Sequence, residues 1–220
     1  MQSFLKSASE EEQHIHNGTC PVPTVFTSNS RAYSYVVAID LVAPCGTTGM
    51  APCVKDGLLS LALCKPNIRK SAKVGDVIIG YLPVKAFAMR GLVKYMAVIT
   101  ALLPPLEYHG RVDMCRPDQI YNAIGGKLVH KGHVAYHLLG NDSRHQQEKD
   151  GRGNVLLSTQ FVCVPGTLPL VINDMEFCAL RGGDQGHKGP TRMSRALHTL
   201  VKGALKNPDK YKAYGAGWPL

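Results

Sequence analysis

The sequence lacks the patterns that identify membrane, secreted and disulfide-bonded proteins. No apolar run approaches the length of a membrane span, and the opening residues lack a basic start followed by an apolar stretch. The seven cysteines include no Cys-x-x-Cys pair, so their spacing supports neither a zinc site nor a disulfide framework. We therefore expect an intracellular protein, cytoplasmic or nuclear, with reduced thiols and no membrane contact.

Common catalytic and cofactor-binding motifs are also missing. The chain has no Gly-x-Gly-x-x-Gly or Gly-x-x-x-x-Gly-Lys-Ser/Thr segment and no Gly-x-Ser-x-Gly nucleophile turn, which argues against a dinucleotide fold, a P-loop and a serine hydrolase. His133 and His137 would lie one turn apart on a helix, as metal ligands can. Gly132, Val134 and Tyr136 favour a strand instead, so we expect no metal and no cofactor.

What the chain does have is positive charge. Its 220 residues carry a net charge of +9 and a pI near 9.2, which favours a polyanionic or phosphate-bearing partner, although basic tails alone would give the same number. Composition divides it into a flexible leader (1–30), a folded domain (31–180), and a basic glycine-rich loop with a C-terminal helix (181–220). The oligomeric state is left open.

Strand patterns dominate the middle of the chain. The β-rich segments are 33–40, 77–81, 91–100 and 154–164, and a helix with an apolar stripe is predicted over 193–206. Pro66 can start a helical turn, and the polar segment 140–153 is expected to be a mobile loop. The pattern predicts an α+β fold, a β-barrel of about five or six strands with short flanking helices.

A cationic break separates two apolar runs between Leu58 and Tyr81. Lys65, Arg69, Lys70 and Lys73 fall within nine residues, and Lys65 and Arg69 would share a face of a helical turn. Because Pro66 follows, the backbone at Cys64 and Lys65 is expected to be extended. The segment is interpreted either as an anion-facing rim or as a loop that lysines keep soluble.

Two further groups are candidates for chemistry. Arg116 precedes a proline, and its guanidinium can address a phosphate or a base edge, or it can be satisfied by Asp113 or Asp118. His145 can transfer a proton if Asp142 orients it. The alternative is a solvated loop held by an Asx turn.

Several ordered motifs carry a family resemblance. Among them are Leu61-Ala-Leu-Cys-Lys-Pro-Asn-Ile-Arg69, Val74-Gly-Asp-Val-Ile-Ile-Gly80 and Asp142-Ser-Arg-His145, within roughly 33–165. The chain resembles the second nucleotide-modification-associated domain family and, more distantly, the PUA-like barrels with their EVE and ASCH relatives. The family commonly has Trp at the position of Val77 and a second histidine at Arg144. The resemblance implies a PUA-like barrel that binds nucleic acid or a nucleotide.

The preferred hypothesis is a binding module that recognises a modified or extruded base, rather than an enzyme. An enzyme of modified-base metabolism, with His145 and Asp142 as its catalytic pair, and a protein-interaction scaffold remain alternatives. The predicted ligand-binding residues are Tyr33, Tyr35, Asp40, Lys65, Arg69, Asp76, Tyr81 and Arg116. The predicted contacts to a nucleic-acid backbone are Lys70, Lys73, Lys188, Arg192 and Arg195.

Overall fold

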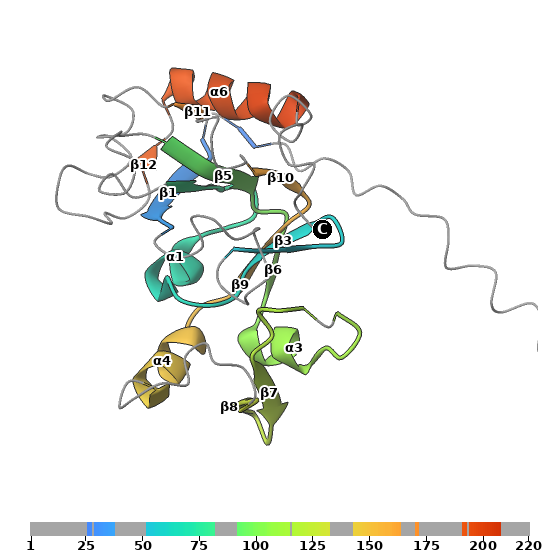
Figure 1. Cartoon of the computed structure of the whole chain (residues 1–220). Coiled ribbons are helices and arrows are strands. Elements are labelled where there is room, and N and C mark those ends of the chain that lie inside the picture. The colour runs from blue at the N-terminus through green and yellow to red at the C-terminus, as the bar shows by residue number, and fades with distance from the viewer. Residues whose placement is uncertain are drawn as a thin grey trace, which may run out of the picture.

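The computed structural model describes residues 26–27, 29–37, 52–81, 92–114, 116–132, 143–163, 170–171, 191–192 and 194–207. Within these ranges, the side chains of 92, 143–146, 170–171 and 191–192 are not described. Strands and helices form a mixed architecture (Figure 1), which confirms the predicted α+β class.

The first sheet, called here the central sheet, has the order β10-β5-β4-β1-β12, and β11 also pairs with β5. The pair β1–β4 is parallel and the other pairs are antiparallel. Val, Ile and Tyr dominate its middle strands, as expected for buried pleated surfaces. The bounds are β1 Arg31–Val36, β4 Val77–Tyr81, β5 Leu92–Val98, β10 Gln160–Cys163, β11 Leu170–Val171 and β12 Thr191–Arg192.

The second sheet has the order β2-β3-β9-β6. Its strands are β2 Cys53–Lys55, β3 Leu58–Leu61, β6 Ala101–Leu103 and β9 Val155–Ser158. Asp56 and Gly57 join β2 to β3 with φ of 51° and 70°, the positive values that a two-residue hairpin turn of type I′ requires. The predicted strand 154–164 is thereby divided between the two sheets, as β9 and β10.

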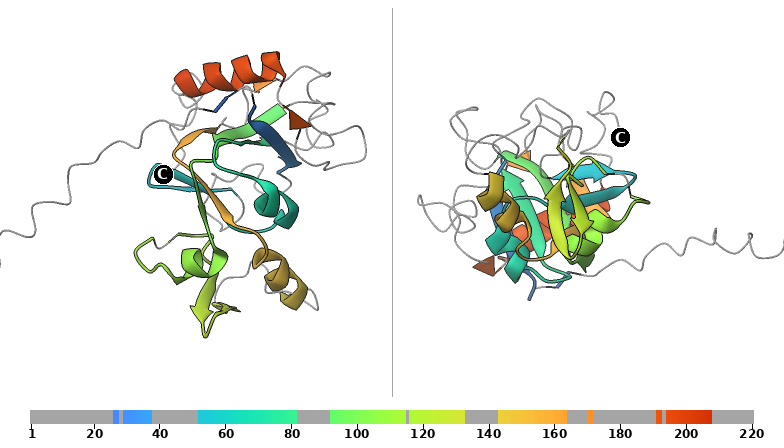
Figure 2. Two further views of the ribbon diagram at one scale, coloured as in Figure 1. Left: turned by 180° about the vertical axis from the view of Figure 1, so that it is seen from behind. Right: turned by 90° about the horizontal axis from the view of Figure 1, so that it is seen from below.

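A separate hairpin and four helices complete the described part. The hairpin is β7 Tyr121–Ile124 and β8 Lys127–His130, and the helices are α1 Pro66–Ser71, α3 Pro105–Gly110, α4 Ser143–Asp150 and α6 Arg195–Lys206. Helix α6 lies at one end of the molecule, and the hairpin with α3 lies at the other (Figures 1 and 2).

Three apolar clusters fill the spaces between these sheets and helices. One lies between α6 and the central sheet, where Leu197 and Val201 belong to the same cluster as Ile79, as the apolar stripe predicted. A second joins the other face of the central sheet to the second sheet and α1, and a third joins the second sheet to α3 and the hairpin. The described strands therefore form three sheets and no closed barrel, so the barrel is not confirmed.

The loop predicted over 140–153 is wrong for most of its length, because Ser143–Asp150 forms α4. Gln, Glu and Lys have good helix propensity, and tertiary contacts hold the end of the helix. The Gln147 amide donates to the Leu128 carbonyl, and Asp150 accepts a hydrogen bond from the Tyr121 hydroxyl. The amino-acid composition shows that this segment is polar, but these tertiary contacts could not be predicted from it.

No helix in the described residues is both long and apolar enough to cross a membrane.

Candidate functional site

Two tyrosines meet on the face of the central sheet that turns away from α6. The Tyr95 hydroxyl donates to the Tyr35 hydroxyl over 2.7 Å, and the ring centroids are 6.0 Å apart in an edge-on arrangement. Gly80 on the strand between them makes room, because a Cβ there would lie 2.2 Å from Tyr95 Cε1. Tyr95 was not among the residues predicted for the site, although a glycine inside an apolar strand signals a close approach.

The Lys65 ammonium lies over the Tyr35 ring, 4.8 Å from its centroid. This is cation–π geometry, and no carboxylate of the described residues lies within ion-pair distance of Lys65. Burial lowers the pKa of this ammonium below its ordinary value, since desolvation penalises the charged form. The pair Lys65 and Tyr35 therefore presents a half-buried cation on a fixed aromatic support.

The turn that carries Lys65 has unusual backbone geometry. Cys64 and Lys65 have φ of 55° and 46°, so the extended backbone predicted before Pro66 is wrong. The Cys64 amide donates to the Asp150 carboxylate at 2.6 Å, and the Arg69 guanidinium donates to the Cys64 carbonyl at 3.4 Å. These contacts hold a left-handed conformation that non-glycine residues seldom adopt, and such conformations gather at functional sites.

Tyr33 lies two residues before Tyr35 and shares the same apolar cluster. Its side chain is 3% exposed, and its hydroxyl has no hydrogen-bond partner among the described residues. Burial raises the pKa of this phenol, so it remains a neutral donor. A buried hydroxyl without a partner is uncommon and calls for an explanation, such as water or a ligand.

Asp76 anchors the start of β1. Its carboxylate accepts from the amide and the guanidinium of Arg31 at 3.0 and 2.9 Å, and from the Lys73 amide at 3.0 Å. Arg31 in turn lies 5.6 Å from the centroid of the Tyr33 ring. The predicted ligand residue Asp76 thus fixes the strand that carries Tyr33 and Tyr35.

Tyr81 does not lie with the other two predicted tyrosines. It belongs to the cluster under α6, together with Val77 and Ile79, whereas Ile78 faces Tyr35. Side chains alternate along β4, so Tyr81 points to the opposite face of the central sheet.

Arg69, a residue of α1, is fully buried against the segment that connects α4 to β9. Its guanidinium donates to the carbonyls of Asn154 and Asp150 at 3.0 and 2.7 Å, besides that of Cys64. Gly153 has φ +74° and its backbone approaches Arg69 so closely that a Cβ would lie 2.6 Å from the Arg69 carbonyl carbon. Arg69 therefore links α1 to the residues between α4 and β9, and it does not share an exposed face with Lys65.

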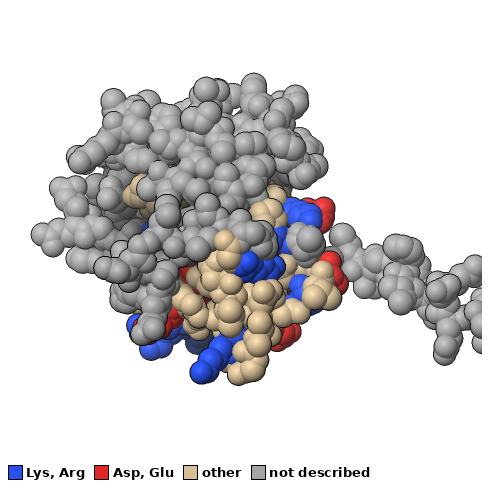
Figure 3. All heavy atoms as spheres, turned by 60° about the horizontal axis from the view of Figure 1, so that its bottom comes forward, with Lys and Arg blue, Asp and Glu red and all other residues tan. Residues whose placement is uncertain are grey.

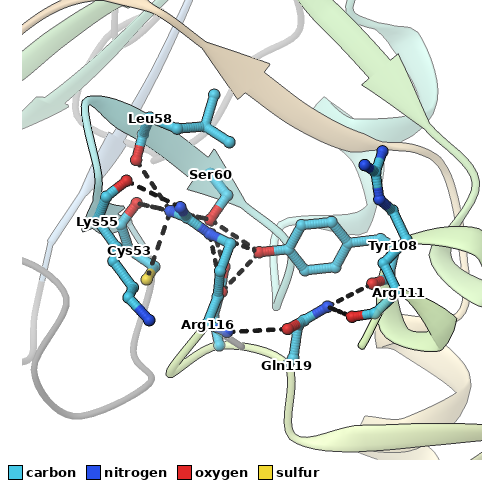
Figure 4. A network of polar contacts seen from close by, with 9 residues as sticks. Cys53, Lys55, Leu58, Ser60, Tyr108, Arg111, Arg116 and Gln119 are labelled. Carbon is cyan, nitrogen blue, oxygen red and sulfur yellow. Dashed lines mark hydrogen bonds and ion pairs between the residues drawn. The ribbon is translucent and has the colours of Figure 1, made fainter. Parts of the chain in front are cut away.

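Arg116 is also buried, in a polar network beside the β2–β3 hairpin (Figure 4). Its guanidinium donates to the hydroxyls of Tyr108 and Ser60 at 3.1 and 3.2 Å, and its Nε lies 3.8 Å from Asp118 Oδ1. It also donates to the carbonyls of Cys53, Lys55 and Leu58. The alternative in which Asp118 satisfies Arg116 is the one observed, while Asp113 pairs with Arg111.

Asp118 completes that network. Its carboxylate accepts from the hydroxyls of Ser60 and Tyr108 at 2.5 and 2.6 Å. Burial raises its pKa, and the hydrogen bonds and Arg116 oppose that shift. The partners of this carboxylate are all within the protein interior, which is the arrangement of a structural network.

The other predicted site residues are dispersed. Lys70 at the end of α1 and Lys73 just beyond it are exposed, near the turn that carries Lys65. Arg195 is exposed on α6, on the opposite side of the central sheet. Arg192 lies in β12 and His145 in α4, with side chains outside the described part. Asp40, Asp142 and Lys188 lie outside the described residues altogether.

Within the described residues, no three His, Cys, Asp or Glu side chains gather as metal ligands.

The fold is thus a mixed α+β domain, and its candidate site is the Lys65 ammonium held over the ring of Tyr35. Comparison with known families shows that residues 29–213 match nucleotide modification associated domain 2. The chain belongs to this family, and the match covers the described elements from β1 to α6. No curated protein and no solved structure matches the chain.

Proposed function

We propose that this domain binds nucleic acid or a nucleotide and recognises a modified or extruded base. Membership of the family connects the chain with nucleotide modification. The observation that carries the proposal is the Lys65 ammonium, held over the Tyr35 ring with no carboxylate of the described part to neutralise it. A phosphate oxygen is the partner that such a cation suits.

Lys70 and Lys73 extend the cationic surface on the same short segment. Both are exposed, and neither has an ion-pair partner among the described residues. Phosphate contacts by lysines supply affinity without reading sequence. In this proposal Lys65 fixes one phosphate and the two exposed lysines add longer-range attraction.

Recognition of the base is assigned to the tyrosine cluster. The Tyr33 hydroxyl is buried without a protein partner among the described residues, and a polar edge of an extruded base can satisfy it. Tyr35 and Tyr95 support Lys65 through their mutual hydrogen bond. We expect the base to bind at these tyrosines in a pocket like that of PUA-like domains.

Fluorescence anisotropy with short oligonucleotides tests the proposal. Single-stranded and double-stranded probes, with and without a modified pyrimidine, are titrated with the full chain at two salt concentrations. We expect binding that weakens with salt, strengthens with the modification and falls about tenfold, or 1.4 kcal/mol, in Lys65→Met, which keeps an apolar stem. The proposal would be contradicted if the chain bound none of the oligonucleotide probes and no free nucleotide.

An enzymatic role is distinguished by analysing the same mixtures for a chemically changed base. Turnover of the modified base by the wild type, abolished in His145→Ala while binding survives, would replace the binding module with an enzyme.

A further inference from the structure

The β7–β8 hairpin projects from the end of the molecule farthest from α6 (Figure 1). Its turn is Gly125 and Gly126, with φ of 56° and 73°, so the tip has no side chains of its own. The last paired residues before the turn are Ile124 and Lys127. The tip is therefore narrow, and these two side chains are the first ones beside it.

The base of the hairpin is firmly held. The Tyr121 hydroxyl donates to Asp150 at 2.8 Å, the Leu128 side chain is buried, and the Lys131 amide donates to the Ile120 carbonyl. The Tyr121 ring also packs edge-on against His109. A ribbon with a fixed base and a free tip is suited to enter a groove or a gap in another molecule.

The outer side of the ribbon is apolar and cationic. Ile124 is 58% exposed and Val129 is 43% exposed, and Lys127 and Asn122 are their exposed cross-strand partners. Between Tyr121 and Gly132 the sequence has two lysines and no acidic residue. Figure 3, which brings this end forward, shows an uncharged surface with Lys and Arg at its borders and Asp and Glu at a few places.

The hairpin is connected to the lysine–tyrosine site through one carboxylate. Asp150 accepts from Tyr121 at the hairpin base and from the Cys64 amide, one residue before Lys65. The same carboxylate therefore fixes both the backbone before Lys65 and the base of the hairpin.

We propose that Ile124 is a wedge that enters the base stack of a nucleic-acid duplex, with Lys127 contacting the adjacent phosphate. This inference rests on the proposed function and names duplex nucleic acid as the molecule bound. Two-stranded ribbons can enter either groove of duplex DNA, and apolar side chains such as Ile insert between base steps from the minor groove. Filling the gap left by an extruded base compensates for part of the lost stacking.

A second copy of the chain is a less suitable occupant. Pairing two hairpins edge to edge in a two-fold dimer repeats the same surface, and it brings cations of both copies together without an acid in the ribbon. Duplex phosphates have the complementary charge. Self-association is therefore an outcome that the test must exclude.

The test uses the full chain and a duplex with 2-aminopurine beside a central modified or mismatched base, because 2-aminopurine fluorescence rises when its stacking is lost. Anisotropy of a second label reports binding in the same tube. We expect wild type to bind and raise the 2-aminopurine signal. Ile124→Ala should lose most of that rise while its Kd changes less than about threefold, since a wedge acts on stacking and the phosphate contacts remain.

Val112→Ala is the matched control, because Val112 is 93% exposed outside the hairpin; it should retain the full rise. Lys127→Gln should weaken binding and lower the salt slope by about one. Duplex binding with no fluorescence rise, or an unchanged rise in Ile124→Ala, would overturn the wedge and leave the proposed function standing. Absence of binding to any nucleic acid would overturn the wedge, and the proposed function would fall with it only if free nucleotides also did not bind. A dimer in sedimentation that Ile124→Ala dissociates, without a fluorescence rise, would assign the hairpin to self-association instead.

Discussion

The Cys64 amide donates to Asp150 Oδ1 across 2.6 Å, and Asp150 Oδ2 accepts from the Tyr121 hydroxyl at 2.8 Å. One fully buried carboxylate thereby joins the left-handed turn before Lys65 to the base of the β7–β8 hairpin. The geometry of the candidate site and the anchoring of the hairpin therefore depend on the same side chain.

Replacing that carboxylate should strongly destabilise the protein. Asp150→Ala leaves two donors without their acceptor, and each buried donor lost in this way costs about 1 to 3 kcal/mol. We expect a fall of about 2 to 6 kcal/mol in the free energy of unfolding, measured by urea denaturation. Glu148→Ala in the same helix removes only an exposed pair with Arg152 and should change stability by less than about 1 kcal/mol. Equal effects would contradict the anchoring role.

Gly80 should not tolerate a methyl group. Its Cβ would lie 2.2 Å from Tyr95 Cε1 and 2.8 Å from Val37 Cγ2, so Gly80→Ala must displace the ring or the strand. We expect a loss of about 1 to 3 kcal/mol, the usual effect of overpacking. Gly203→Ala is the control, because its Cβ would meet nothing within 4 Å on helix α6 and should stabilise the protein by about 0.5 to 1 kcal/mol. Thermal unfolding of both variants separates steric conflict from helix propensity.

Arg116 should matter for stability more than for binding. Arg116→Met leaves the buried Asp118 without its cation, and breaking a buried pair from one side costs about 3 to 5 kcal/mol. Arg111→Met removes an exposed pair with Asp113 and should cost less than about 1 kcal/mol. If chemical denaturation gives similar values for the two variants, the buried network does not stabilise the fold as described.

His109 should make stability dependent on pH. The ring lies between those of Tyr108 and Tyr121, with centroids 5.3 and 5.2 Å away, and neither nitrogen has a hydrogen-bond partner among the described residues. Burial, and then the charge of Arg69, lower the pKa of His109 to about 3. The folded pKa lies below that of the unfolded chain, so the unfolded state binds more protons between these values.

Stability should therefore fall as the pH drops from about 6.5 toward 3, by up to about 1.4 kcal/mol per pH unit from this residue. His109→Phe and His109→Gln both remove the titration and should flatten this part of the curve, whatever their stability at pH 7. Urea denaturation at several pH values provides the measurement. A slope that is identical in wild type and both variants would show that other groups control it.

Strand positions and the C-terminal helix could be predicted because they depend on local patterns. Alternation marked the strands, and the spacing of Leu197 and Val201 marked the buried face of α6. Alternation alone, however, does not determine the register in which two strands pair. Tyr81 therefore was grouped with Tyr35 although the parallel pairing of β1 with β4 sends it to the other face.

The burial of arginines could not be read from their charge. Arg69 and Arg116 belong to cationic or polar stretches, yet their guanidinium groups donate to carbonyls that lie 85 and 63 positions away in sequence, at Asn154 and Cys53. Long-range contacts also set the left-handed turn at Cys64 and Lys65. Of the predicted cationic rim, Lys65, Lys70 and Lys73 are left as partly or fully exposed side chains.

The most direct test of the central claim is the salt dependence of nucleic-acid binding by Lys65→Met, compared with wild type and with Lys202→Met, which removes an exposed lysine on α6. We expect Lys65→Met to lower the affinity about tenfold and to reduce the slope of log K against log salt concentration by about one, which is the signature of one lost phosphate contact. Lys202→Met should match wild type in both. An unchanged affinity and slope in Lys65→Met would contradict the claim that this lysine binds the ligand.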